Sequence, residues 1–342
     1  MQQVTLKQLV PYMKTYRNAG VSMGIIGPPG LGKTAVVNQF ADSVGSGLLA
    51  MRIADKDVID LKGLPDNYVD PISGKKFSRF LEAEFINVLD NIVKAKGSAI
   101  LFLDEMLQAN RSMQVIAQQL LNENRIGEHT LPKNVWKVFA SNRMGDKAAV
   151  NSPSTATANR VGIVEAVPDH QAWHEWAVSV DILPEIVAFF KTRPDQLFSV
   201  LHKGFHELYA SGEWVYCSPR SVENLSKLVK AHGAYDMTLC CSIVGDSIGA
   251  QLYSYAHSAR NLPDLSWLEV GDVEAAKKCP CPEEPDLQYM AMYSVLYNCK
   301  ESTQVQAAVT YINKFPREYI SVFTKELVVK LPSSVLVLSR ML

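Results

Sequence analysis

The first 168 residues alternate between short apolar runs and segments in which apolar residues recur every three to four positions. The recurring spacing is typical of helices, and short continuous apolar runs are typical of strands that are buried on both faces. Helices are predicted at residues 4–18, 35–40 and 113–121, and strands at residues 21–26, 48–53, 98–103 and 135–140. Because buried strands that alternate with helices form parallel sheets, the pattern predicts an α/β fold with a parallel sheet sandwiched by helices.

The pattern changes after about residue 168. From His170 onward the spacing is helical, with few runs that resemble strands. Residues 261–286 are rich in proline and acidic residues, so we expect an extended connector there, after which the helical spacing returns. The predicted organisation is an α/β core, a helical domain, and a connector with a helical C-terminal extension, over residues 1–168, 169–260 and 261–342.

The composition is that of a folded protein without a strong overall charge. Of the 342 residues, 47% are apolar, which excludes intrinsic disorder as the dominant state. Lys and Arg number 34 and Asp and Glu number 35, so the net charge is 34 − 35 = −1. A global attraction to nucleic acid or to anionic lipid is therefore absent. The net charge averages over local patches, so it does not exclude a basic groove on part of the surface.

The sequence gives no sign of a membrane or secretory protein. No stretch approaches the roughly 18 consecutive apolar residues that a membrane helix requires, and no secretory signal is visible at the start. The six cysteines do not form a disulfide framework: four lie among apolar neighbours, and Cys279-Pro-Cys281 has no second pair at zinc-ligand spacing. We therefore expect a reduced, cytoplasmic protein that does not associate with membranes.

Residues 27–34 match the phosphate-binding (Walker A) pattern G-x-x-x-x-G-K-[ST] in full, between a predicted strand and a predicted helix. Glycines let the backbone turn its N–H groups toward phosphate oxygens, and the N-terminus of the following helix adds positive potential. We expect Lys33 to reach the β- and γ-phosphates and the Thr34 hydroxyl to ligate Mg²⁺. The predicted nucleotide-binding residues are Gly27, Pro28, Pro29, Gly30, Leu31, Gly32, Lys33, Thr34 and Ala35.

Two acidic residues, Asp104 and Glu105, follow the apolar run at residues 98–103. Acids at the C-terminal end of a neighbouring strand face the crevice in which open α/β sheets bind ligands. We expect Asp104 to hold Mg²⁺, directly or through water. We expect Glu105 to polarise the attacking water, because hydrolysis needs a base near the γ-phosphate. This pair corresponds to a Walker B motif.

Together these motifs resemble those of AAA+ ATPases, and specifically of the MoxR-like branch. The resemblance covers residues 15–235 well and the C-terminal quarter more loosely. It implies that Asn142, at the end of a predicted strand, is sensor 1, whose amide orients the attacking water. It also implies that Arg160 is the arginine finger that reaches a neighbouring subunit's ATP. Here Val161 stands where the family usually has phenylalanine, so Arg143 is the alternative finger.

Three further segments fit the resemblance. Residues 218–225 resemble the sensor 2 motif that opens a lid helix, so Ser218 is expected to cap this helix, Pro219 to lie in its first turn and Arg220 to face the nucleotide. Residues 57–74 and 125–132 resemble insertions of the MoxR-like branch that face the central channel of a ring. The glycine turn in the second insertion predicts a β-hairpin. For each insertion, a plain surface loop is the alternative.

The resemblance implies a Mg²⁺- and ATP-dependent ATPase that forms a homo-oligomeric, hexameric ring and remodels or assembles a protein partner in a chaperone-like manner. In MoxR-like systems the partner commonly carries a von Willebrand factor A domain. The alternative is a nucleic-acid translocase or loader, which needs basic residues along its channel. The only compact basic cluster near the expected channel is formed by Lys75, Lys76 and Arg79, at the first insertion. A third hypothesis, an inactive nucleotide-binding scaffold, is disfavoured by the intact Glu105.

Overall fold

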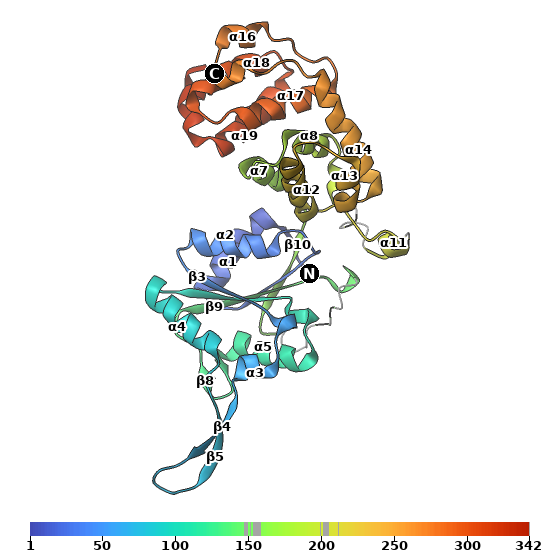
Figure 1. Ribbon diagram of the computed structural model, residues 1–342. Coiled ribbons are helices and arrows are strands. Elements are labelled where there is room, and N and C mark those ends of the chain that lie inside the picture. Colours follow the sequence, from blue (N-terminus) through green and yellow to red (C-terminus); the bar gives the residue numbers. More distant parts are fainter. Residues whose placement is uncertain are drawn as a thin grey trace. The chain divides into compact units, whose positions relative to one another are not determined.

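The computed structural model describes residues 1–146, 150, 152, 159–198, 200, 205–210 and 212–341. The chain divides into two compact units (Figure 1). Met1–Pro168 lie in the first unit, and almost all described residues from Asp169 onward lie in the second.

A six-stranded parallel sheet forms the centre of the first unit. Its strand order is β1-β10-β2-β9-β6-β3, and each neighbouring pair is parallel. The strands are β1 (Gln3–Thr5), β2 (Met23–Ile26), β3 (Gly47–Arg52), β6 (Ala99–Asp104), β9 (Val135–Ser141) and β10 (Gly162–Val167). The predicted parallel sheet and its four predicted strands are therefore confirmed, whereas β1 and β10 were missed. The prediction began the first helix inside β1, because three residues are too few to give a strand pattern.

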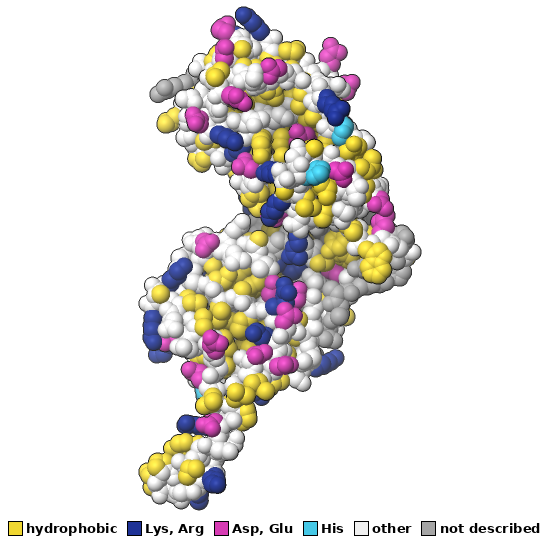
Figure 2. Space-filling view, viewed as in Figure 1, with side chains coloured by type: hydrophobic (Ala, Val, Ile, Leu, Met, Phe, Trp, Pro, Cys, Tyr) yellow, Lys and Arg dark blue, Asp and Glu magenta, His cyan; other side chains and the backbone are white. Residues whose placement is uncertain are grey.

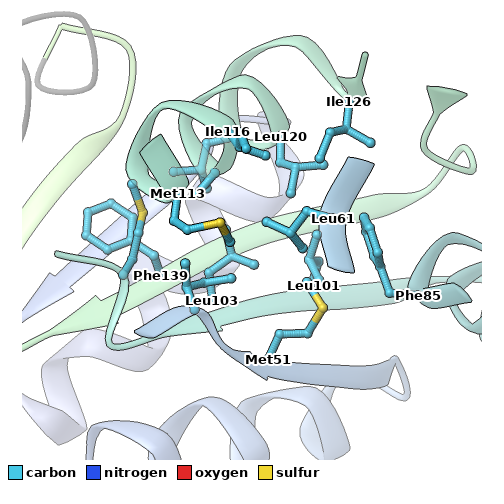
Figure 3. Close-up of a cluster of buried hydrophobic side chains, with 14 of the residues drawn as sticks. Met51, Leu61, Phe85, Leu101, Leu103, Met113, Ile116, Leu120, Ile126 and Phe139 are labelled. Atoms are coloured by element: carbon cyan, nitrogen blue, oxygen red, sulfur yellow. The ribbon is translucent and has the colours of Figure 1, made fainter. Parts of the chain in front are cut away.

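Helices cover both faces of this sheet (Figure 1). One face carries α1 (Leu6–Asn18) and α2 (Lys33–Ser43), and the other carries α4 (Glu84–Lys96) and α5 (Arg111–Glu123). The helix α5 begins where the Asn110 side chain accepts a hydrogen bond from the Met113 N–H at 2.9 Å. Its apolar face, with Met113, Ile116 and Leu120, packs on Leu101 and Leu103 of β6 (Figure 3). This core holds the strand ends in fixed positions.

Both predicted insertions contain hairpins. The first consists of α3 (Val58–Lys62) followed by β4 (Pro65–Val69) and β5 (Lys76–Phe80), which pair antiparallel. All ten residues of these two strands are exposed, and apolar side chains are visible along the hairpin in Figure 2. The second is the predicted hairpin, formed by β7 (Arg125–Ile126) and β8 (His129–Thr130). A hydrogen bond of 3.0 Å between His129 Nε2 and the Phe80 carbonyl joins the two hairpins.

The described residues of the second unit form helices and no strands. After α7 (His170–Ser179), α8 (Pro184–Thr192) and α9 (Pro194–Leu197), α11 (Phe205–Ala210) leads to α12 (Pro219–His232), α13 (Met237–Val244) and α14 (Asp246–His257). The C-terminal part contains α15 (Trp267–Val270), α16 (Val273–Lys278), α17 (Pro285–Asn298), α18 (Ser302–Ile312), α19 (Arg317–Lys330) and α20 (Val335–Met341). Short 3-10 segments η1 (Ile53–Asp55), η2 (Met106–Gln108), η3 (Met144–Asp146), η4 (Ser258–Asn261) and η5 (Pro332–Ser334) complete the elements.

The prediction of an extended connector at residues 261–286 was wrong, because this segment contains α15 and α16. Acidic residues there begin helices rather than keep the chain extended: Asp272 caps α16 by accepting from the Glu274 and Ala275 N–H groups at 2.9 and 3.0 Å. Trp267 is buried and anchors α15. The helices before and after this segment pack together, with α17 on α8 and α19 on α7. Among the helices that the structure describes, none has the length and apolarity needed to cross a bilayer.

Candidate nucleotide-binding site

The loop between β2 and α2 has the backbone that the glycine pattern predicts. Gly30 and Gly32 adopt left-handed conformations with φ of 77° and 109°, which side chains other than glycine rarely tolerate. Gly27 lies so close to β10 that a Cβ atom would come within 2.8 Å of the Ala166 carbonyl oxygen. The Gly27 N–H donates to the Ser141 carbonyl of β9 at 3.1 Å. The loop is thus curled at its centre and tied to the sheet at its start.

Lys33 is the first residue of α2 and is buried. Its Nζ donates hydrogen bonds to the carbonyl oxygens of Gly27 and Pro28 at 2.7 and 2.9 Å. It also donates to Oδ1 of Asn142 at 3.0 Å. The ammonium group therefore lies inside the curve of its own loop and in contact with the residue that follows β9. Of the other predicted loop residues, Leu31 is buried and Ala35 is exposed in the first turn of α2.

The two predicted metal ligands are in direct contact. Thr34 Oγ1 donates to Oδ2 of Asp104 at 2.9 Å, and the other carboxylate oxygen accepts from the Glu105 N–H at 3.0 Å. Both side chains offer oxygen donors, which are the ligands that Mg²⁺ prefers. In the described residues no group of three or more His, Cys, Asp or Glu side chains could hold a metal ion. This donor set fits Mg²⁺ that is also held by water and phosphate oxygens, as is usual for this ion.

Glu105 lies immediately after β6 in a left-handed conformation with φ of 55°. Non-glycine residues adopt this conformation uncommonly, and such backbone strain clusters at functional sites. The Glu105 Oε2 atom is 3.5 Å from Nε of Arg52, and the Glu105 side chain is 35% exposed. Arg52 is the last residue of β3 and pairs in register with Asp104. Arg52 was not predicted as a site residue, because only the strand register places it beside Glu105.

Arg143, the alternative arginine finger, is held inside the first unit. Its NH2 atom is 2.8 Å from Oδ1 of Asp146, and its NH1 atom is 3.9 Å from Oε1 of Glu165 on β10. The Asp146 side chain is buried, with 1% of its surface exposed. Arg143 is thus neutralised by carboxylates of its own unit.

Arg160 and Arg220 are both exposed, the first in the first unit and the second in the second unit. Arg160 is exposed just before β10. Thr157 and Ala158, which begin the predicted finger segment at residues 157–164, lie outside the described residues. The pKa of Glu123 lies below its ordinary value, mainly because Arg125 donates a hydrogen bond to it, and the charge of Arg160 acts in the same direction. Arg220 is exposed in the first turn of α12 in the second unit. As predicted, Ser218 caps this helix, accepting from the Ser221 N–H at 3.2 Å.

The fold and this site define a class: an α/β protein with a parallel sheet, a phosphate-binding loop and a helical C-terminal part. Residues 23–151 match the family described as "ATPase family associated with various cellular activities (AAA)". Residues 23–151 therefore resemble an AAA-family domain, and the match covers less than half of this chain.

The similar curated proteins are chaperone proteins ClpB. The ClpB of Mycobacterium tuberculosis strain H37Rv is 32% identical over 172 residues, which cover 44% of this chain and 19% of the relative. The ClpB of Dichelobacter nodosus is 41% identical over 86 residues, which cover 24% of this chain and 9% of the relative. This chain thus spans a small part of the length of the relatives it matches.

Among solved structures, the RuvB Holliday junction branch migration motor of Thermotoga maritima aligns with a TM-score of 0.38 and 14% identity. The alignment covers 73% of this chain and 67% of that chain.

Proposed function

We propose that this protein is a Mg²⁺-dependent ATPase of the MoxR-like branch of the AAA+ class, which forms a hexameric ring and remodels or assembles a protein partner. One observation carries the proposal: Lys33 and Thr34 of the loop contact Asn142 and Asp104, the residues at the ends of β9 and β6. These contacts join the phosphate-binding loop to the side chains that hydrolysis requires.

Nucleotide binding is assigned to the loop and the first turn of α2. The Lys33 ammonium now donates to two loop carbonyls, and phosphate oxygens of ATP would take their place as stronger, charged acceptors. The Thr34 hydroxyl and the Asp104 carboxylate would hold Mg²⁺. When bound, the ion would neutralise the negative charge that develops on the β- and γ-phosphates. The positive end of α2 favours the same anion.

Hydrolysis is assigned to Glu105 and Asn142. Glu105 is partly exposed, so its carboxylate can meet water, and its left-handed backbone turns it out of the β6 ladder. In this role Glu105 accepts a proton from the attacking water, and the Asn142 amide orients that water. The Arg52 guanidinium lies beside the Glu105 carboxylate, with Nε 3.5 Å from Oε2.

Arg160 is the proposed arginine finger. A finger must be free to reach a neighbouring subunit, and Arg160 is exposed, whereas Arg143 is paired with the buried Asp146. Arg220 is the proposed sensor 2, in the lid that we assign to residues 169–260. The MoxR-like assignment is supported by the hairpins in both insertions. The chaperone names of the ClpB relatives and the resemblance to MoxR-like systems favour a protein partner, and the latter favours one with a von Willebrand factor A domain.

One observation favours the alternative function, a nucleic-acid translocase or loader. On the exposed β4–β5 hairpin, the Arg79 guanidinium carbon lies 4.5 Å from the centre of the Tyr68 ring, with Lys75 and Lys76 nearby in the sequence. Aromatic and basic side chains together suit single-stranded nucleic acid, whose binding falls steeply with salt. Gel shifts across a salt series test it, because a translocase would bind at low salt and release at high salt.

Sedimentation combined with an ATPase assay tests the main proposal. The wild-type protein is expected to hydrolyse ATP only with Mg²⁺ and to reach the mass of a hexamer when ATP is present. A protein that stays monomeric and inactive at all concentrations with Mg²⁺ and ATP would contradict the proposal.

A further inference from the structure

A short closed turn follows Asn142. Asp146, at the end of η3, accepts hydrogen bonds from the Arg143 backbone N–H at 2.9 Å and from its NH2 group at 2.8 Å. The Arg143 Nε also donates to the same carboxylate at 3.1 Å. In return, the Asp146 N–H donates to the Arg143 carbonyl at 3.1 Å. One buried carboxylate thus fixes both the backbone and the side chain of Arg143.

Asn142 therefore lies between two fixed points. On one side is Ser141, the last residue of β9, whose carbonyl accepts from the Gly27 N–H. On the other side is the closed turn of Arg143 and Asp146. From this position Asn142 Oδ1 accepts the hydrogen bond from Lys33. The position of the Asn142 amide at the phosphate-binding loop is therefore fixed by Ser141 on one side and by the Arg143–Asp146 turn on the other.

The Arg143–Asp146 pair fixes the orientation of the turn more than it stabilises the fold. A buried ion pair contributes little net stability, because the cost of removing two charges from water offsets their attraction. Arginine gives a planar fork that locks the orientation of a carboxylate, which a lysine cannot do. The second carboxylate near Arg143, that of Glu165, lies on β10, the strand beside β2. This contact joins the turn to β10, the neighbour of the strand that leads into the loop.

We propose that Asp146 is a positioning residue for ATP hydrolysis: it locks Arg143 and so holds the Asn142 amide at the phosphate-binding loop. Arg143 then acts within its own subunit and not on a neighbour. The inference rests on the proposed function, since it concerns the part that Asn142 takes in hydrolysis. It adds two residues, Arg143 and Asp146, that act through Asn142.

A double-mutant cycle tests this inference. Asp146→Asn, Asn142→Ala and the double variant are compared in kcat and in the Kd for a fluorescent ATP analogue. We expect Asp146→Asn to lower kcat by about 10- to 100-fold, the size of effect expected when a group in an active site is misplaced. The Kd should change by less than about threefold. The double variant should be no slower than Asn142→Ala, because the two residues act through one amide.

The matched control is Asp236→Asn. Asp236 also accepts a hydrogen bond from a backbone N–H, that of Leu239 at 3.0 Å, but caps α13 in the second unit. It should leave kcat unchanged. The inference is overturned if Asp146→Asn keeps the wild-type kcat, or if its effect multiplies with that of Asn142→Ala. If wild-type protein hydrolyses no ATP, the proposed function fails before the inference is reached.

A second variant covers the case in which Asp146→Asn does not fold. Arg143→Lys keeps the charge but loses the fork, so it should lower kcat in the same non-additive way with Asn142→Ala. Mixing Arg143→Lys with Lys33→Ala subunits should restore no activity, because Arg143 acts within its own subunit. Restored activity in that mixture would overturn the inference and make Arg143 a finger in trans.

Discussion

Thr34 at the start of α2 donates a hydrogen bond from Oγ1 to Oδ2 of Asp104 at the end of β6, across 2.9 Å and 70 positions of sequence. The contact brings a hydroxyl and a carboxylate together at the mouth of the phosphate-binding loop. Neither residue is deeply buried, so the pair is accessible to an ion. A magnesium ion needs such oxygens along with water and phosphate.

Asp104→Asn is expected to weaken the response to Mg²⁺ more than the binding of nucleotide. The amide keeps an oxygen for Thr34 but loses the charge that attracts the cation. The Mg²⁺ concentration for half-maximal ATPase should rise about tenfold or more, equivalent to at least about 1.4 kcal/mol. Nucleotide affinity in chelator should stay as in wild type. Asp42→Asn, at an exposed position of α2, is the control. An unchanged Mg²⁺ response of Asp104→Asn would remove Asp104 from the metal site.

Lys33→Ala is expected to abolish nucleotide binding. The variant loses the ammonium that would reach the β- and γ-phosphates, and it also leaves the Gly27 and Pro28 carbonyls without this donor. Calorimetric titration with ATP should give no measurable heat of binding. The exposed Lys14→Ala variant should bind as the wild type does. If Lys33→Ala retains wild-type affinity, the assignment of the phosphate-binding loop is wrong.

Arg160→Ala is expected to disable a neighbouring subunit's site. Fingers of this kind contribute about 10³-fold or more to turnover. Mixing Arg160→Ala subunits, whose own sites are intact, with Lys33→Ala subunits, whose fingers are intact, should restore part of the ATPase activity. The restored rate should rise with protein concentration, because it depends on assembly. If mixed rings form and no activity returns, Arg160 is a structural arginine.

Short sequence patterns predicted the features that depend on residues adjacent in the sequence. Continuous apolar runs gave four of the six strands, and the glycines at 30 and 32 occupy the left-handed positions that a phosphate-binding loop needs. The hairpin of β4 and β5 was missed because all its residues are exposed, so no alternation of buried and exposed positions marks it. The contacts of Arg52 with Glu105 and of Arg143 with Asp146 depend on strand register and on a local turn. No motif in the sequence specifies them.

Stability is expected to fall as the pH falls through the range in which His174 would ordinarily titrate. His174 is buried between Trp173 and Tyr293, and burial holds its pKa well below the ordinary 6.5, with the charge of Lys191 acting the same way. Below about pH 6.5 the unfolded chain binds a proton here that the folded protein does not, so unfolding becomes easier. Below this pH, the free energy of unfolding should fall by up to about 1.4 kcal/mol per pH unit because of His174.

Urea unfolding of the wild type and His174→Phe, at about pH 7.5 and about pH 5.5, measures this dependence on pH. The variant should lose less free energy of unfolding on acidification, whereas the exposed His232→Phe should behave as the wild type does. The buried Glu326 acts in the opposite direction at lower pH, because burial raises its pKa, and the comparison of variants removes its effect. If the free energy of unfolding depends on pH equally in His174→Phe and in the wild type, His174 titrates alike in the folded and unfolded protein.

Glu105→Gln tests whether this site hydrolyses ATP with Glu105 as the base. Single-turnover hydrolysis and Kd for ATP should be measured together on the wild type and this variant, with Mg²⁺ present. The amide should leave Kd nearly unchanged and lower the hydrolysis rate by about 10²-fold or more, the size expected for loss of a general base. Hydrolysis at the wild-type rate in Glu105→Gln would show that Glu105 is not the base.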